Sequence, residues 1–208
     1  TVIDALRYTA SGEGFSRPEL SEIDYVNHRV ITLTCHRREN YGGPMRNIFE
    51  AVRNTALRFP DVIFVYPVHL SPVVRQAAGE LLSGVENIKL IEPLDAVDMH
   101  RLMAKSYMVM TDSGGLQEEA PALGKPVLVL RRETERPEAV EAGTVVLAGT
   151  ERENIELLAA KLLTDRAEYD RMAQAVNPYG DGRACPRIAD AICYAFGLSD
   201  RRPEEFSA

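Results

Sequence analysis

The sequence predicts an α/β fold, a Rossmann-like, doubly wound parallel sheet of about six strands. Short apolar, β-branched segments alternate along the chain with longer segments of helical period. The clearest apolar segment is RVITLTC at residues 29–35, a composition typical of a strand that is buried on both faces. Because helical segments separate consecutive strands, the pattern indicates βαβ units with right-handed crossovers, and therefore parallel strands.

The first helix shows how the remaining elements are assigned. Pro44 stands in its first turn, where the missing N–H costs least, and Ile48, Val52 and Ala56 follow at helical spacing. The expected strands are residues 29–35, 62–68, 87–91, 107–111, 126–130 and 145–147. The expected helices are residues 44–59, 71–82, 96–104, 115–123, 152–163, 167–175 and 183–196.

The two ends of the chain differ in character from this alternating middle. The chain starts with TVIDAL, without an initiator Met, and residues 10–21 are polar and contain Gly, Ser and Pro. We therefore expect residues 1–22 to be an interdomain linker or the end of a preceding domain. Residues 23–198 are expected to form one nucleotide-binding domain with C-terminal helices, and residues 199–208 a frayed polar tail.

Composition excludes several classes of partner. The 208 residues are 45% hydrophobic, enough to bury a sizeable core, and carry a formal net charge of -7. An acidic chain is a poor match for nucleic acid, and no apolar run approaches the roughly 20 residues of a membrane helix. The start lacks a signal-peptide pattern. Three cysteines without ligand spacing indicate reduced thiols, a cytoplasmic location and no metal site.

The stretch TDSGG at residues 111–115 is the first candidate site. It follows an expected strand and opens an expected helix, so its N–H groups point at whatever lies in front. Gly114 and Gly115 allow close approach of a phosphate, Ser113 adds a hydroxyl, and Glu119 is placed to accept from ribose hydroxyls. An ordinary strand-to-helix turn explains the same residues. No Walker motif or GxGxxG occurs.

Three other loops follow expected strands, at the edge of a parallel sheet where ligands bind. HRREN places His36 and Arg37 after the first strand, and PVHLSP places His69 after the second. RRETERPE carries Arg136 together with Arg131 and Arg132, and an arginine fork binds diphosphate well. Each loop also has a structural alternative. HRREN can be a solvated basic loop, and His69 in PVHLSP an ordinary surface histidine. The arginines of RRETERPE can form ordinary ion pairs with the neighbouring glutamates.

The remaining polar residues do not form a recognisable catalytic pattern. No pair of carboxylates, Ser/His/Asp set or Cys/His nucleophile stands out in the sequence. Cys35 adjoins His36, but neighbouring strand residues face opposite ways, so Cys35 is interpreted as a core residue. Asp181 lies in a glycine-rich turn and is interpreted as a turn or helix-entry residue.

Four motifs together resemble the non-hydrolysing UDP-N-acetylglucosamine 2-epimerases of bacteria. They are CHRREN (35–40), PVHLSP (67–72), TDSGGLQEEAPALGKPVLVLRRETERPEAVEAGT (111–144) and NPYGDGRAC (177–185). The resemblance extends over nearly the whole chain. It implies a GT-B-type architecture of two Rossmann-like domains with the active site between them, of which this chain corresponds to the second.

The resemblance also implies a reaction. These enzymes are expected to interconvert UDP-GlcNAc and UDP-ManNAc by removing the proton on the sugar's C2 and eliminating UDP. UDP then returns to the 2-acetamidoglucal intermediate after protonation on the other face. The nucleotide is substrate and leaving group, so no cofactor and no metal is expected. The product would supply cell-surface polysaccharide biosynthesis.

Site residues follow from the matched motifs. The diphosphate would be held by Ser113, Gly114 and Gly115, and the ribose by Glu119. His36 and Arg136 would lie at the phosphates or the sugar, with His36 as the catalytic candidate. Arg37 and His69 resemble positions of a second, regulatory UDP-GlcNAc site. Met99 stands near the uracil, where the family often has Phe.

Other departures and gaps limit what the chain is expected to do alone. The usual DTTERPE reads RRETERPE, which adds Arg132 and Glu133 near the phosphates. The family's acid/base Asp and Glu lie in the N-terminal domain, so this chain is expected to be inactive alone and to retain weak UDP binding. The full-length enzyme is expected to be a homodimer. Two alternatives stay open: the nucleotide-sugar-binding domain of a GT-B glycosyltransferase, and a stand-alone nucleotide-binding module.

Overall fold

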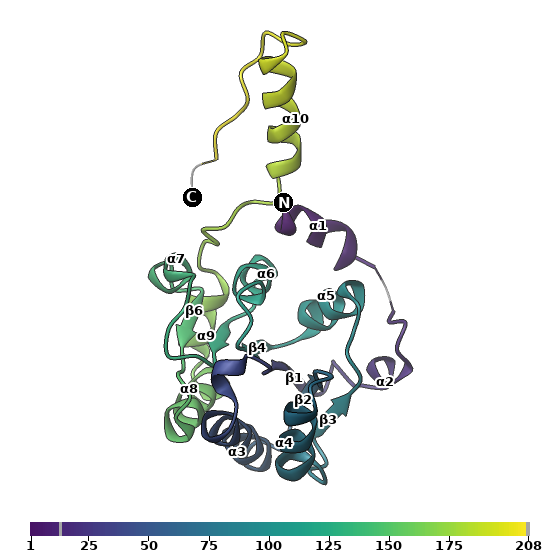
Figure 1. Cartoon of the computed structure of the whole chain (residues 1–208), viewed down its shortest axis with the longest axis vertical. Helices are drawn as coiled ribbons and strands as arrows, with labels where there is room; N and C mark the ends of the chain where they lie inside the picture. The colour runs from purple at the N-terminus through teal and green to yellow at the C-terminus, as the bar shows by residue number, and fades with distance from the viewer. Residues whose placement is uncertain (13, 207–208) are drawn as a thin grey trace.

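The computed structural model describes residues 1–12 and 14–206 and contains a six-stranded parallel sheet (Figure 1). The strands are β1 (Arg29–Thr34), β2 (Val62–Pro67), β3 (Ile88–Ile91), β4 (Met108–Thr111), β5 (Val127–Val129) and β6 (Val145–Leu147). Their spatial order is β3-β2-β1-β4-β5-β6. The predicted fold class and the six predicted strands are confirmed, and each strand boundary lies within a residue of the expected position.

Helices cover both faces of this sheet. They are α1 (Val2–Thr9), α2 (Pro18–Ser21), α3 (Gly43–Arg58), α4 (Pro72–Leu82), α5 (Ala96–Lys105), α6 (Leu116–Ala122), α7 (Pro137–Glu141), α8 (Arg152–Thr164), α9 (Arg166–Ala173) and α10 (Ala184–Ala195), and a 3-10 turn spans Arg38–Asn40. In Figure 1, α3, α4 and α8 lie on one side of the sheet, and α1, α5 and α6 on the other. This is the doubly wound arrangement.

Alternate residues of the strands feed two separate cores. Ile31 and Leu33 of β1 face the core formed with α3, α4 and α8, in which Cys35 is also buried, as predicted. Val30 faces the opposite side, where it packs with Leu102 and Leu20. Because both faces are covered, the strands lack the polar alternation of a half-exposed sheet.

Residues 1–22 contain two helices that the sequence analysis did not predict. Ile3 and Leu6 of α1 are buried, and α1 packs against α5 and α6. Leu20 in α2 is fully buried in the core beneath α5. The segment therefore belongs to the packed body of the domain. Its role as an interdomain connection stays a prediction, as does the frayed tail, of which residues 199–206 are described.

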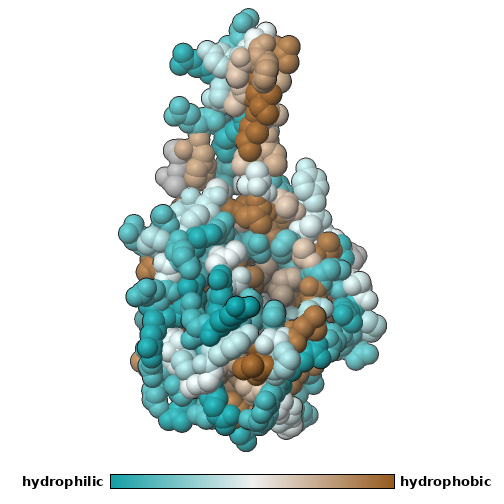
Figure 2. All heavy atoms as spheres, in the orientation of Figure 1, coloured by the Kyte–Doolittle hydropathy of each residue, from teal (hydrophilic) through white to brown (hydrophobic). Residues whose placement is uncertain are grey.

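Helix α10 extends away from the body of the molecule (Figure 1). Its start is fixed by α1, because the Asp4 carboxylate accepts from the N–H groups of Ala184 and Cys185 at 3.1 and 2.7 Å. Its apolar side chains recur every four residues at Ile188 and Ile192 and are half exposed. Figure 2 shows this helix as an apolar stripe above a mostly polar body. No described helix is long and apolar enough to cross a membrane.

Candidate functional site

The candidate site lies where the strand order reverses, between β1 and β4. These strands pair in parallel with Thr34 opposite Thr111, and the two threonine hydroxyls are hydrogen-bonded at 2.6 Å. The loops that follow the two strands are therefore held side by side. In open parallel sheets a ligand site forms at this point, because adjacent loops diverge to opposite faces and leave a crevice.

Asp112 connects these loops and is fully buried. Its Oδ2 accepts from the N–H groups of His36 and Arg37, both at 2.7 Å, and from Asn40 Nδ2 at 3.1 Å. The Asn40 amide also donates to the carbonyl of Leu130, so the loop after β5 is tied to the same point. Asp112 is not among the site residues predicted from the sequence. An aspartate directly after a strand, in a motif already suspected of binding phosphate, was the available signal.

His36 and His69 meet at the rim of this crevice. Their rings stack with centroids 5.2 Å apart and an interplanar angle of 15°. His36 Nδ1 lies 3.6 Å from Asp112 Oδ1. Burial lowers the pKa of His36, the Asp112 carboxylate opposes that effect, and the charges of His69 and Arg37 lower the pKa further. Two histidines predicted for separate roles, catalytic and regulatory, thus lie face to face.

The TDSGG loop presents free backbone donors to the crevice. The Ser113 N–H donates to Thr111 Oγ1 at 2.9 Å and is therefore occupied. Within residues 1–12 and 14–206, the N–H groups of Gly114 and Gly115 have no protein acceptor. A Cβ at Gly114 would lie 3.7 Å from the Arg37 guanidinium, so this cation stands against the loop. Two backbone donors beside a cation can bind an anion such as a phosphate.

Glu119 lies one turn into α6 and is largely buried. Its Oε1 would lie 3.6 Å from a Cβ at Gly115, and its Oε2 is 3.5 Å from His100 Nε2. His100 Nδ1 in turn is 2.7 Å from the Thr9 hydroxyl in α1. Glu119 is thus held at the loop through a histidine that the sequence analysis did not select. His100 carried no recognisable signal, because it stands alone in an amphipathic helix.

The arginines of the RRETERPE loop all pair with carboxylates. Arg131 is buried between Glu39 and Glu135, which raises the pKa of its guanidinium. Arg136 pairs with Glu118 of α6 and so reaches the same helix as Glu119. Arg132 also pairs with a carboxylate, that of Glu151. The three arginines therefore form ordinary ion pairs with glutamates, which was the alternative to diphosphate binding. A role of Arg136 at the phosphates stays a prediction.

Met99 and Asp181 complete the predicted residues. Met99 in α5 is partly buried and packs against the small core cluster that Leu116 and Tyr179 also join, near the start of α6. Its contact with uracil stays a prediction. Asp181 accepts from the Arg183 N–H and pairs with Arg187, so it is a turn and helix-entry residue as predicted. No group of three metal-ligating side chains occurs among the described residues.

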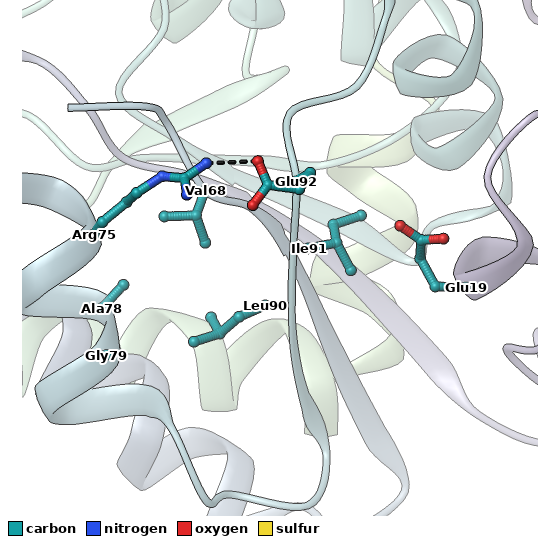
Figure 3. A pocket seen from close by; sticks show the side chains of 8 residues that line it. All are labelled: Glu19, Val68, Arg75, Ala78, Gly79, Leu90, Ile91 and Glu92. Carbon is teal, nitrogen blue, oxygen red and sulfur yellow. Dashed lines mark hydrogen bonds and ion pairs between the residues drawn. The ribbon is translucent and has the colours of Figure 1, made fainter. Parts of the chain in front are cut away.

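A hollow separate from the candidate site lies at the β3 edge of the sheet, beside α4 (Figure 3). Apolar side chains such as Val68 and Leu90 line it. Its only lining cation, Arg75, is engaged by Glu92 at 2.5 Å. Because it lacks the unengaged donors that diphosphate requires, this hollow does not compete with the crevice at the switch point as a nucleotide site.

Comparison with known proteins agrees with this description. The fold is a Rossmann-like domain of the GT-B type. Residues 1–193 match the family model described as UDP-N-acetylglucosamine 2-epimerase, and the chain belongs to that family. A UDP-N-acetylglucosamine 2-epimerase of Bacillus subtilis is 53% identical over 207 residues, covering 100% of this chain and 54% of the relative. The chain thus spans about half the length of the curated relatives it matches.

Solved structures of relatives superpose closely. The S. aureus MnaA–UDP co-structure has a TM-score of 0.90 at 46% identity and covers 99% of this chain and 55% of that chain. UDP-GlcNAc 2-epimerase from Neisseria meningitidis, bound to UDP-GlcNAc, has a TM-score of 0.85 at 44% identity and covers 92% and 53%.

Proposed function

We propose that this chain is the UDP-binding half of a non-hydrolysing UDP-GlcNAc 2-epimerase, an isomerase that interconverts UDP-GlcNAc and UDP-ManNAc. The observation that carries the proposal is the arrangement of the two loops that follow β1 and β4. There Asp112 ties the His36–Arg37 turn beside the unengaged amides of Gly114 and Gly115. Family membership and relatives crystallised with UDP and UDP-GlcNAc support the same assignment.

In this proposal the diphosphate lies against Ser113, Gly114 and Gly115. Breaking the bond between the sugar's C1 and the phosphate oxygen leaves negative charge on the β-phosphate. Preorganised N–H donors of the TDSGG loop stabilise that charge as it develops. The nucleotide is itself the leaving group, so the reaction as proposed uses no cofactor and no metal.

The remaining contacts fix the nucleoside and the sugar. Glu119 accepts hydrogen bonds from the ribose hydroxyls, and Met99 packs its thioether against uracil. His36 is the residue of this half that acts on the reacting sugar nucleotide. Arg136 forms an ion pair with Glu118. To contact the phosphates, its guanidinium must either break this ion pair or bind Glu118 and a phosphate at the same time.

A regulatory UDP-GlcNAc site at Arg37 and His69 is the second part of the proposal. The stacking of His69 on His36 supports communication between that site and the catalytic one. A ligand that moves His69 would also change the surroundings of the His36 ring.

A companion N-terminal half supplies the acid/base carboxylates, and the complete enzyme works as a homodimer. The exposed apolar stripe of α10, including Ile188 and Ile192, supports a partner surface beyond this chain. On this proposal the enzyme acts in the cytoplasm, in the biosynthesis of cell-surface polysaccharide, and the chain alone is inactive.

The test uses the chain joined to an N-terminal half of the family. The joined protein is supplied with UDP-GlcNAc and no acceptor, and the products are followed by NMR. Appearance of UDP-ManNAc supports the proposal. Sugar transfer to an added acceptor, without epimerisation, identifies a GT-B glycosyltransferase instead. UDP binding without any turnover identifies a nucleotide-binding module.

A further inference from the structure

Asp112 has one carboxylate oxygen that the fold leaves unsatisfied. Oδ2 receives three hydrogen bonds, whereas Oδ1 is buried and has no hydrogen-bond partner among the described residues. A buried, unpaired acceptor on a charged group is costly, so such atoms call for a physical explanation. His36 Nδ1 lies 3.6 Å from this oxygen, and the buried Cys35 thiol also lies beside the Asp112 carboxylate.

The surroundings of His36 leave Asp112 as the group that selects its tautomer. His69 stacks on the ring face, and its own Nδ1 accepts from the Ser71 N–H at 3.1 Å. Arg37 is the adjacent residue, and its N–H is taken by Asp112. Ring stacking does not distinguish the two ring nitrogens, whereas a carboxylate oxygen opposite Nδ1 does.

The positions of the lone pairs decide which ring nitrogen of His36 carries the hydrogen. A neutral imidazole carries its hydrogen on one nitrogen only. If the hydrogen sat on Nε2, the lone pair of Nδ1 would face the lone pairs of Asp112 Oδ1. With the hydrogen on Nδ1, the same pair of atoms attracts. Because burial lowers the pKa of His36 and favours the neutral ring, the choice of tautomer decides which nitrogen is free.

We propose that Asp112 is a positioning residue that holds His36 as the Nδ1–H tautomer and leaves Nε2 as the nitrogen that meets the reacting sugar nucleotide. The last clause rests on the proposed function, whereas the tautomer does not. One carboxylate thus serves two tasks. Oδ2 shapes the turn that carries His36 and Arg37, and Oδ1 orients the ring, as carboxylate–histidine pairs do in other sites.

The first test needs no enzymatic activity. Long-range 15N–1H correlation spectra of this chain, with His36 assigned by the loss of its signals in His36→Gln, report the tautomer directly. The expected result for the unsubstituted chain is a protonated Nδ1 and an unprotonated Nε2. A predominant Nε2–H tautomer at neutral pH overturns the proposal.

The second test replaces the carboxylate by an amide. In Asp112→Asn the amide oxygen can still accept from the His36 and Arg37 N–H groups, which leaves the NH2 group opposite Nδ1. A donor at that position favours the Nε2–H tautomer, so the His36 pattern should invert. An unchanged pattern in a folded variant overturns the proposal. The backbone amide spectrum shows whether the variant is folded, and the first test stands if it is not.

Turnover of the chain joined to its N-terminal half separates positioning from structure. Asp112→Asn is expected to lower kcat about 100-fold, the scale of lost acid/base alignment. In a His36→Gln background the same substitution should lower kcat no further. If Asp112→Asn lowers kcat by the same factor in the His36→Gln enzyme as in the otherwise unsubstituted enzyme, Asp112 does not act through His36. If the joined enzyme turns over no UDP-GlcNAc, either with or without Asp112→Asn, the proposed function fails. The NMR result still decides the tautomer of His36.

Discussion

Replacing Glu119 by alanine should weaken UDP binding, because its carboxylate is held at the nucleotide crevice. The side chain is 15% exposed, and its two oxygens face Gly115 and His100. This placement has two consequences. The carboxylate loses little conformational freedom when a ribose arrives, and little water separates it from the ligand.

The expected magnitude follows from the hydrogen bonds that would be lost. A hydrogen bond to a charged group contributes about 1.5–3 kcal/mol, and part of it is returned when water fills the vacated space. The net loss is therefore about 1–3 kcal/mol, which corresponds to about a 5- to 150-fold increase in the Kd for UDP. Glu141→Ala, at an exposed position of α7, is the matched control and should leave Kd unchanged.

Calorimetry with UDP and 2′-deoxy-UDP makes the assay specific for the ribose. The unsubstituted chain should bind the deoxy nucleotide more weakly, because one hydroxyl partner of Glu119 is missing. Glu119→Ala should bind the two nucleotides equally well. An unchanged Kd for UDP, or a deoxy penalty that survives the substitution, would remove Glu119 from the ribose site.

Three further predictions concern catalysis and the terminal helices. His36→Ala should lower kcat of the joined enzyme at least about 100-fold, and near-normal kcat in a steady-state assay would exclude His36 as the catalyst. Leu6→Ala should lower the free energy of unfolding, measured in urea, by about 2 kcal/mol, because Leu6 is buried. The control Val26→Ala, at an exposed position, should change it by less than about 0.5 kcal/mol. Equal effects of the two substitutions would show that α1 is not part of the fold. Asp4→Asn should lower the Tm at neutral pH, because backbone donors lower the pKa of Asp4 in the folded state. That contribution is present above the unfolded pKa of about 4 and is lost as pH falls through the lower folded value, so a Tm difference that does not shrink as the pH is lowered would contradict it.

The alternation of strands and helices was readable because the four central strands, β2, β1, β4 and β5, are buried on both faces. Segments such as residues 29–34 are then rich in apolar and β-branched residues, and the amphipathic helices between them have a different period. The order of the strands was not readable in this way. Whether β4 pairs with β1 or with β3 depends on which side of the sheet each crossover passes, and local sequence carries little of that information.

The missed parts of the site share one cause. Asp112 and His100 act through partners that are distant in sequence, His36 in one case and Glu119 in the other. A lone aspartate or histidine has many possible environments, so its role becomes visible only when the partner is placed. The TDSGG loop was recognised because its glycines and the helix start are adjacent in the chain.

Helix α1 was missed for a related reason. It spans only eight residues, with Ile3 and Leu6 as its buried apolar anchors, and so short a helix is not stable by itself. Packing against α5 and α6 stabilises it in the folded domain. Tertiary contacts, rather than local propensity, thus determine this element.

A crystal structure of this chain with UDP tests the central claim most directly. The account predicts β-phosphate oxygens within hydrogen-bond distance of the Gly114 and Gly115 N–H groups, with the ribose at Glu119. UDP bound elsewhere, with that corner vacant or both amides bonded to protein acceptors, would contradict it.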